Sequence, residues 1–488
     1  MYSFVLSLIA LVAGFFLYGR LVEKVVGPDP KRQTPCFTSQ DGVDFIPMPT
    51  WKIYLIQFLN IAGTGPIFGA ILGVLYGPSA YFWIVFGCIF GGAVHDYVSA
   101  MASLRQNGAS LPEIIGNELG GVARIVMRLF SLVLMILVGA VFVTTPAGLL
   151  ESLTGSGAGF VGSAAFWTIL IILYYIFAAI LPIDKLIGRI YPVFGFALLM
   201  MAVGMLWGIF FENGNMPEVT TAFANHHPSS TIPVFPGLCI TVACGAVSGF
   251  HATQSPMMAR CLKNETLGRR VFYGAMITEG IVALIWAAAA IKFADSITQY
   301  DGTPYQKLWA LMTKGGTSSA NPALVVDMVC HDWLGTLGAI LAILGVVAAP
   351  ITTGDTAFRC ARLIAADFLR FKQDKLYKRL ALALPIFAIS ITLLFVDFAV
   401  LWRYFSWFNQ TLSVFTLWAM TVWLARQGKN YFITLIPAMF MMCVCTSYIC
   451  VAPEGLTLPV SISYAVGIAA VLVEVLWFYK WKSGMARK

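Results

Sequence analysis

The stretch that decides the fold is Asn60-Ile61-Ala62-Gly63-Thr64-Gly65-Pro66, which lies inside a run without charged residues from 53 to 95. Two glycines permit unusual backbone dihedrals, and Pro66 lacks an amide donor and suits the first turn of a new helix. The stretch therefore predicts a membrane-spanning helix that breaks midway. In hydrocarbon, backbone groups freed by a break are costly unless protein or a hydrated cavity receives them. Such a break indicates an internal site.

A second interruption of the same kind occurs later in the chain. The stretch from Gly245 to Pro256 reads Gly-Ala-Val-Ser-Gly-Phe-His-Ala-Thr-Gln-Ser-Pro and lies within an apolar run from 235 to 258. The two breaks are five predicted spans apart, and an odd offset means that the two helices cross the membrane in opposite directions. This is the pattern of an inverted repeat with a substrate held between two broken helices.

The composition agrees with a chain whose solvent is largely lipid. Of its 488 residues, 59% are hydrophobic and 11% charged, and the mean hydropathy is +0.81. So few charged side chains do not provide enough polar surface for a water-soluble protein of 53.2 kDa. A soluble enzyme, a disordered scaffold and a nucleic-acid binder are therefore excluded, and we expect an all-α polytopic membrane protein.

Apolar runs with few or no charged residues, long enough to span a bilayer at roughly 20 residues each, number thirteen. They lie near 3–19, 53–76, 80–103, 125–150, 163–182, 190–211, 235–258, 271–294, 334–354, 379–396, 401–425, 431–452 and 458–480. The second and seventh are the discontinuous helices. Spans 2–6 and 7–11 form the predicted five-plus-five inverted repeat.

The basic residues predict the orientation of these spans. Thirteen alternating spans with an outer N-terminus place all but four of the 31 lysines and arginines on the cytoplasmic side, as the positive-inside rule requires. The four exceptions are Lys292, Lys307, Lys314 and Arg403. The net charge of +8 is thereby explained without nucleic acid, and the first run is expected to remain as an anchor because Arg20 and Lys24 follow it.

The same spans divide the chain into four parts. Residues 1–50 are the N-terminal peripheral helix and a cytoplasmic loop, 51–211 the first repeat, and 212–425 the second repeat with a long outer loop at 295–333. Residues 426–488 are two C-terminal peripheral helices and a basic tail. Within the first repeat, Ser110-Leu111-Pro112-Glu113 predicts a capping box that opens a short helix closed by Gly120-Gly121.

Several chemistries find no support in the sequence. The chain has no G-x-x-x-x-G-K-[ST] motif for nucleotide and no H-E-x-x-H motif for zinc. Most of the ten cysteines lie inside apolar runs, where a thiol is normally a small hydrophobe. We therefore expect reduced core cysteines, no metal site, no cofactor and no enzymatic activity.

The first turn of a half-helix offers free amide groups and a partial positive charge, so it can hold a carboxylate without a basic side chain. Both breaks are expected to supply substrate contacts, and His251 is either a proton-exchanging group or a neutral histidine bonded to the loosened backbone. The predicted substrate-binding residues are Asn60, Gly63, Thr64, Gly65, Pro66, Ser248, Gly249, Phe250, His251 and Thr253.

Five stretches resemble the carbon starvation protein A family. They are Asn60 to Pro66, Asp41-Gly42-Val43-Asp44-Phe45 with Pro47, Arg105 to Leu111, Cys244 to Ala252, and Thr352-Thr353-Gly354-Asp355-Thr356. The resemblance implies a LeuT-like transporter of the amino acid/polyamine/organocation superfamily in the bacterial inner membrane, with peptides and pyruvate as the substrates associated with the family. It also implies a cation held between hydroxyls of span 9 and the first broken helix.

The predicted ion-coupling residues are Thr352, Thr353, Asp355, Asp96 and Glu279. Asp355 is either a cation ligand or the i,i+4 partner of Arg359. Asp96, beside His95, is expected to face protein rather than lipid. The His95-Asp96 pair is interpreted either as a structural ion pair with Arg105, Arg124 or Arg128 or as a group that takes part in transport.

Together these observations predict a secondary active transporter that imports a small carboxylate-bearing nutrient, a peptide or pyruvate, during nutrient starvation. Import is expected to be coupled to protons or sodium. The alternative is a channel or a nutrient-sensing receptor for the same class of ligand.

Overall fold

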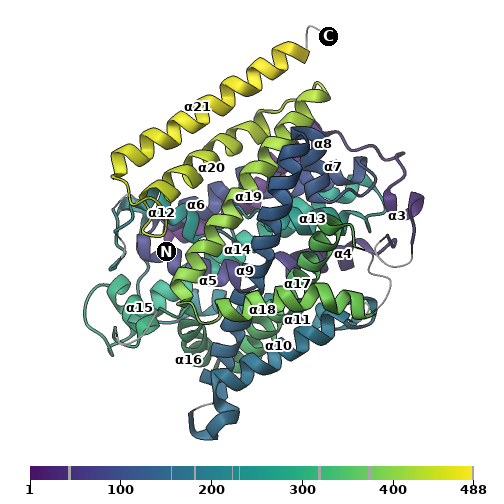
Figure 1. The fold of residues 1–488 in the computed structure, drawn as a ribbon. Helices are drawn as coiled ribbons and strands as arrows, with labels where there is room; N and C mark the ends of the chain where they lie inside the picture. Colours follow the sequence, from purple (N-terminus) through teal and green to yellow (C-terminus); the bar gives the residue numbers. More distant parts are fainter. Residues whose placement is uncertain are drawn as a thin grey trace.

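The computed structural model describes residues 1–41, 45–154, 156–180, 183–221, 224–229, 231–316, 320–371 and 376–485. The motif from Asp41 to Phe45 therefore lies largely outside the described residues, as do the basic segments at 372–375 and 486–488. Within the described ranges every regular element is a helix, as predicted. Figure 1 shows these helices as one bundle.

The α-helices have the following bounds: α1 Tyr2–Phe16, α2 Tyr18–Val26, α3 Pro35–Thr38, α4 Thr50–Ile61, α5 Thr64–Gly73, α6 Ser79–Phe86, α7 Ala93–Arg105, α8 Leu111–Leu119, α9 Gly121–Thr154, α10 Ala164–Ile180, α11 Ile183–Phe211, α12 Val234–Thr241, α13 His251–Ala259, α14 Gly274–Ser296, α15 Pro304–Thr313, α16 Pro322–Ala342, α17 Ala348–Leu369, α18 Leu376–Leu393, α19 Phe398–Arg426, α20 Phe432–Val451 and α21 Val460–Met485.

Eight helical segments of the described chain are long and apolar enough to cross a membrane, or nine when the bent pair α4–α5 counts as one span. The protein is therefore a multi-pass membrane protein. The four other predicted spans correspond to α10, α12–α13, α18 and α19, which are shorter or more polar helices. The count of thirteen spans and the inverted repeat remain predictions.

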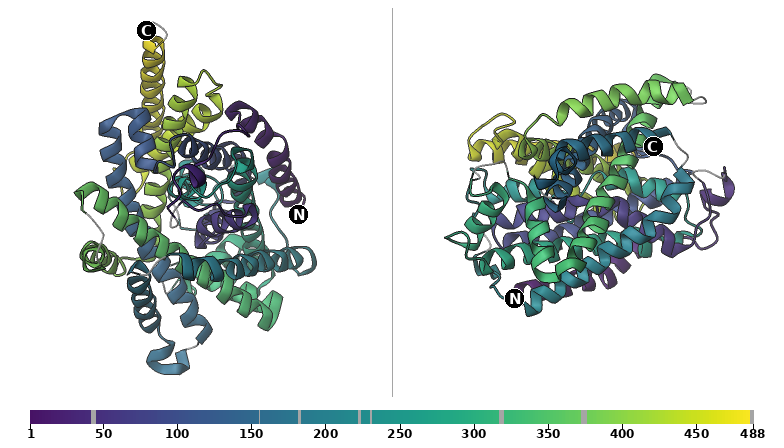
Figure 2. Two further views of the ribbon diagram at one scale, coloured as in Figure 1. Left: turned by 90° about the vertical axis from the view of Figure 1, so that its right-hand side faces the viewer. Right: turned by 90° about the horizontal axis from the view of Figure 1, so that it is seen from below.

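The degree of burial separates central from peripheral helices. The apolar windows of Ser79–Arg105 and Glu265–Ser296 are each 89% buried, whereas those of Tyr2–Val26 and Val460–Met485 are 22% and 11% buried. α21 packs on α20 along one edge of the bundle (Figure 1), and its C-terminal end projects beyond the other helices (Figure 2). The site must therefore be sought around α7 and α14.

The first predicted break is present between α4 and α5, whose axes differ by 46°. It is shorter than expected, because only Ala62 and Gly63 interrupt the helices and Thr64 already begins α5. Pro66 then lies in the first turn of α5, where its missing amide donor costs no intrahelical hydrogen bond.

The second break is also present, but its position differs from the prediction. Residues 242–250 are non-helical, and α13 begins at His251. The segment from Ala252 to Pro256 is therefore helical, although the sequence placed it in the interruption. Pro256 lies inside α13, where its missing amide removes one intrahelical hydrogen bond.

The ninth predicted span is displaced along the chain. The sequence ended it at residue 354 and so placed Thr352, Thr353 and Asp355 near its inner end, but the apolar segment in the structure runs from Ile340 to Ala366. Asp355, Arg359 and Arg362 are buried, with 2%, 7% and 6% exposure. Because these charges lie inside the bundle, they do not mark the end of the span, and Asp355 lies near its middle.

Two local predictions are confirmed. Ser110 and Glu113 form the capping box at the start of α8, and Gly120, with φ of 100°, ends that helix. None of the ten cysteines, all of them in the described ranges, forms a disulfide, and nine of them are buried, Cys443 being half-buried.

Candidate functional site

The first break ends in a turn whose polar side chains are buried and unsatisfied. Thr64 and Asn60 are 0% and 7% exposed, and neither the Thr64 hydroxyl nor Asn60 Oδ1 has a hydrogen-bond partner. The first amides of α5 also have no acceptor within their own helix. A small polar ligand placed here would satisfy groups that are otherwise costly to bury.

Glycines bring the first break into contact with two other segments. A Cβ atom at Gly65 would lie 2.6 Å from Cys244 Sγ in the second break, and one at Gly63 would lie 3.2 Å from the Thr353 hydroxyl oxygen of α17. The two breaks therefore meet, as the sequence predicted. The Thr353 hydroxyl of α17 lies against the first break, at Gly63.

Asn409, in the middle of α19, satisfies much of the second break. Its Oδ1 accepts from the Phe250 amide at 2.7 Å and from the Ser248 hydroxyl at 3.2 Å, and its backbone carbonyl accepts from the Gly249 amide at 3.1 Å. Asn409 thus satisfies three donors of a buried non-helical segment from another helix. Thr253, by contrast, lies in α13 and donates its hydroxyl to the Phe250 carbonyl at 2.7 Å.

His251 lies between two buried carboxylates that come from different helices. Its Nδ1 is 3.1 Å from Asp96 Oδ2 of α7, and its Nε2 is 3.5 Å from Glu279 Oε2 of α14. All three side chains are 0% exposed. Asp96 Oδ1 also contacts His95 Nδ1 at 2.8 Å.

The predicted arginine partners of Asp96 are therefore wrong. Arg105 pairs with Glu265 at 3.0 Å, and Arg124 donates to Asn117 at 2.9 Å. The two histidines take the place of an arginine because Asp96 faces the second break. Glu279, for which the sequence offered no partner, receives the Gly245 amide at 3.1 Å in addition to its contact with His251.

The α17 residues form a separate group beside the first break. Asp355 lies 3.7 Å from Arg359, so the predicted i,i+4 pair is present, but Asp355 Oδ1 makes no hydrogen bond. Arg359 instead donates to the Ala178 carbonyl at 2.9 Å. The Thr356 hydroxyl donates a hydrogen bond to the Thr352 backbone carbonyl at 3.0 Å. The pair is therefore loose, and the carboxylate retains coordinating capacity.

Sequence reasoning missed two residues of the site. Asn409 belongs to the Asn409-Gln410 pair, the most polar point in an apolar helix, and this was the available signal. Cys244 was treated as a small hydrophobe, whereas its Sγ accepts from Asn409 Nδ2 at 3.7 Å and adjoins the first turn of α5.

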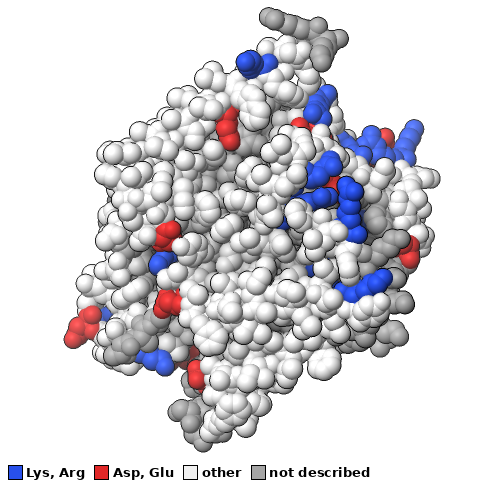
Figure 3. All heavy atoms as spheres, in the orientation of Figure 1, with Lys and Arg blue, Asp and Glu red and all other residues white. Residues whose placement is uncertain are grey.

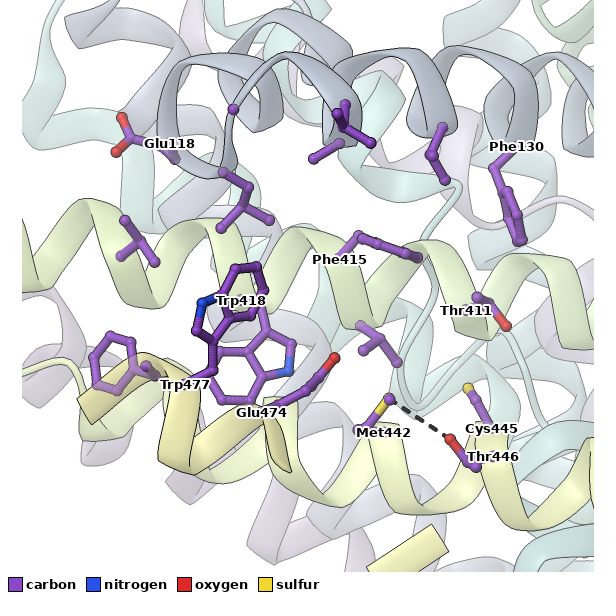
Figure 4. A pocket seen from close by; sticks show the side chains of 18 of the residues that line it. Glu118, Phe130, Thr411, Phe415, Trp418, Met442, Cys445, Thr446, Glu474 and Trp477 are labelled. Atoms are coloured by element: carbon purple, nitrogen blue, oxygen red, sulfur yellow. Dashed lines mark hydrogen bonds between the residues drawn. The ribbon is translucent and has the colours of Figure 1, made fainter. Parts of the chain in front are cut away.

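A large apolar cavity lies away from the breaks, between α9, α19, α20 and α21. It measures about 810 Å³, and Figure 4 shows Trp418 and Glu474 beside it. Arg426 and Glu118, which pair at 3.2 Å, line it near one end. None of the predicted site residues lines this cavity, so it is distinct from the site at the breaks.

A bundle of membrane-spanning helices in which two broken helices meet at a buried polar site is the architecture of secondary transporters. The family described as "Carbon starvation protein CstA" matches residues 1–161, 147–302 and 311–448. The chain belongs to this family, as the resemblance of its motifs predicted.

Its relatives are bacterial. The chain is 45% identical over 331 residues to an "Uncharacterized membrane protein" of Haemophilus influenzae, a match that covers 59% of this chain and 89% of the relative. It is 31% identical to the "Peptide transporter CstA" of Bacillus subtilis, covering 59% and 58%, and 29% identical to the "Pyruvate/proton symporter BtsT" of Escherichia coli, covering 55% and 46%. The chain thus matches only about half the length of these two named transporters.

Solved transporter structures share the fold. An Eremococcus coleocola manganese transporter superposes with a TM-score of 0.53 at 13% identity, covering 91% of this chain and 98% of that one. MhsT in complex with L-phenylalanine gives a TM-score of 0.51 at 13% identity, covering 88% and 98%. The fold is therefore the LeuT-like fold of secondary transporters, and the protein is not expected to be an enzyme.

Proposed function

We propose that this protein imports a small carboxylate-bearing nutrient across the bacterial cytoplasmic membrane by cation symport. The observation that carries the proposal is the first turn of α5, where a buried Thr64 hydroxyl and Asn60 Oδ1 have no hydrogen-bond partner beside unpaired helix-end amides. The substrate carboxylate accepts hydrogen bonds from these amides and from the Thr64 hydroxyl. Asn60 Oδ1 accepts from an N–H of the substrate where there is one, as in a peptide; pyruvate carries no such donor.

The chemistry of this turn selects a class of substrate. No lysine or arginine is needed, because the partial positive charge at the N-terminus of α5 stabilises one carboxylate. The names of the relatives, a peptide transporter and a pyruvate/proton symporter, fall within the class that such a site accepts. Each of those substrates carries one terminal carboxylate.

The coupling cation binds on the α17 side of the first break. Thr353 reaches the first break at Gly63, and Asp355 two residues later carries a buried oxygen without a hydrogen bond. A hydroxyl, a carboxylate and the carbonyls freed at the break are oxygen ligands suited to a small cation. Substrate and cation then share the same break, so each stabilises the backbone arrangement that the other requires.

The N-terminus faces outward and the C-terminus lies in the cytoplasm. The distribution of charge supports this orientation, because Lys and Arg gather at the end of the bundle that carries α8 (Figure 3). Arg105, Glu265, Arg269 and Glu23 form ion pairs at this end and connect α2 to the central helices.

A substrate-competition panel tests the proposal. Purified protein in liposomes is given one labelled substrate, either pyruvate or a dipeptide, with unlabelled pyruvate, lactate, dipeptides and tripeptides as competitors under a proton or a sodium gradient. We expect competition only from molecules with a free carboxylate, and none from the matching amides or esters. Equal competition by the amides would refute carboxylate binding at α5.

A further inference from the structure

Three side chains that commonly bind transition metals meet at the second break. Cys244 lies within the break, His251 begins α13, and Glu279 belongs to α14. One donor atom from each lies within 4.8 Å of the other two, and all three residues are buried. The three residues therefore come from the break itself, from the helix that follows it and from a further helix, α14.

In both His251 and Glu279, one polar atom of the side chain has a hydrogen-bond partner and the other has none. Asp96 contacts His251 Nδ1 at 3.1 Å, and the Gly245 amide donates to Glu279 Oε1 at 3.1 Å. The opposite atoms, His251 Nε2 and Glu279 Oε2, face each other across 3.5 Å, are buried and make no hydrogen bond. A carboxylate that orients the far nitrogen of a histidine is the usual outer partner of a metal-binding histidine.

Two facing acceptor atoms need a positive charge between them, which is either a second proton on the imidazole, making the contact an ion pair, or a bound cation. With Nδ1–H directed to Asp96, Nε2 presents a lone pair to a carboxylate oxygen in a site that excludes water. Neither atom has a hydrogen-bond partner at this geometry, so the neutral imidazole and the carboxylate leave two buried acceptors that a metal ion would bind. The energetic cost of the empty arrangement therefore favours a bound positive ion.

The third group, Cys244, decides which cation fits best. Its sulfur accepts from Asn409 Nδ2 at 3.7 Å and donates to the Ser248 hydroxyl at 3.7 Å, and loss of the thiol proton on metal binding would leave a thiolate that keeps the Asn409 donor. Sulfur and imidazole ligands suit zinc-class ions, whereas sodium, magnesium and calcium prefer oxygen.

We propose that Cys244, His251 and Glu279 bind a divalent transition-metal ion of the zinc class. Tetrahedral coordination with ordinary metal–ligand lengths places neighbouring donor atoms roughly 3.3–3.6 Å apart. The His251–Glu279 separation of 3.5 Å already lies in this range, and the sulfur, within 4.8 Å of the other two donors, needs to approach them by up to about 1.5 Å, on the scale of a side-chain rotation. The first turn of α5 adjoins the sulfur ligand at Gly65.

A bound ion restricts the second break. It links the loop at Cys244 and the first turn of α13 to α14, whereas alternating access requires broken helices and their partners to move relative to one another. The ion is therefore a reversible inhibitor of transport. This consequence rests on the proposed function, but metal binding itself does not.

Binding is measured on the full-length purified protein after chelator treatment, without any transport. Titration with Zn²⁺ against a chromogenic chelator gives the affinity. Titration with Co²⁺ gives a spectrum in which thiolate ligation produces a charge-transfer band. We expect one high-affinity site per chain and a thiolate band that is absent from Cys244→Ser. Cys239→Ser is the matched control, because Cys239 is also buried and lies on α12.

Two further variants separate ligation from folding. Glu279→Gln keeps an acceptor for the Gly245 amide but loses the anionic ligand, and we expect it to weaken Zn²⁺ binding by more than about 10-fold. Asp96→Asn removes the partner of His251 Nδ1, and we expect a loss of about 10- to 100-fold. Variants are compared only after their elution profiles and melting temperatures match those of the parent protein.

The proposal is overturned if the parent protein binds no Zn²⁺ above the level of a chelator-treated control, or if Cys244→Ser and Glu279→Gln both bind it unchanged. Binding without inhibition of uptake would keep the site and reject its effect on transport. Absence of uptake in every condition, with metal binding intact, would reject the proposed function and keep the site.

Discussion

Gly65 is the residue at which the two breaks come closest, because the space beside it is filled by the Cys244 side chain. A Cβ atom there would lie 2.6 Å from Cys244 Sγ and 2.8 Å from Cys244 Cβ. Gly65→Val should therefore abolish uptake by displacing the first turn of α5 from the second break. Overpacking typically costs only about 1–3 kcal/mol, so the protein should still reach the membrane.

Gly484→Ala is the control for this experiment, since a Cβ atom at Gly484 would meet nothing within 4 Å. Uptake and membrane abundance are measured together for both variants. Normal uptake by Gly65→Val would show that the substrate does not depend on the first turn of α5.

Asp355 is the residue that distinguishes a coupling role from a structural one. Its contact with Arg359 is 3.7 Å long, and one of its oxygens makes no hydrogen bond. Asp355→Asn should therefore remove most of the dependence of uptake on the cation gradient while leaving the melting temperature within a few degrees of the parent value. Asp301→Asn, in an exposed loop, is the control. A large fall in melting temperature with unchanged gradient dependence would assign Asp355 a structural role.

The second break is an element held in place by contacts from another helix. Asn409 accepts from the Phe250 amide and from the Ser248 hydroxyl, so Asn409→Ala leaves buried donors unsatisfied at about 1–3 kcal/mol each. We expect a clearly lower melting temperature in detergent and reduced uptake. Thr416→Val, on the same helix, removes a hydroxyl that donates to its own helix at Leu412 and should change the melting temperature far less. Equal effects of the two variants would contradict this role for Asn409.

Elements with local signals were predictable from the sequence. The capping box at Ser110 and Glu113 and the break at Gly63 depend on residues within one turn of each other, so their pattern is visible in the chain. The ninth span was misplaced because charge was used as a boundary. Asp355, Arg359 and Arg362 are buried, and only the packing of other helices around α17 makes that possible.

The partners of the site could not be read in the same way. Asp96, His251 and Glu279 lie on three helices, and nothing local in the sequence states that α7, α13 and α14 meet at one point. The sequence found each of these residues because a polar group within an apolar run requires an explanation. It assigned the wrong partner to Asp96 because nearby arginines in the chain were the only visible candidates.

At the scale of the whole molecule, the bundle separates a buried centre from a peripheral layer. α7 and α14 are almost fully buried by the other helices and carry residues of the site. By contrast, most of the surface of α1 and α21 is not covered by other helices of the chain. The polar side chains at the breaks are buried, Thr64 and His251 at 0% and Asn60 at 7% exposure. Substrate can reach them only if the surrounding helices move, which is the behaviour of a transporter rather than of an open pore.

Accumulation against a gradient is the measurement that tests this account most directly. Purified protein in liposomes is supplied with labelled pyruvate or a short peptide while an inward proton or sodium gradient is imposed, and the internal concentration is followed over time. We predict that the internal concentration rises above the external one and falls back when an ionophore collapses the gradient. Uptake that merely equilibrates, with the same final level with and without the gradient, would contradict cation symport and indicate a channel.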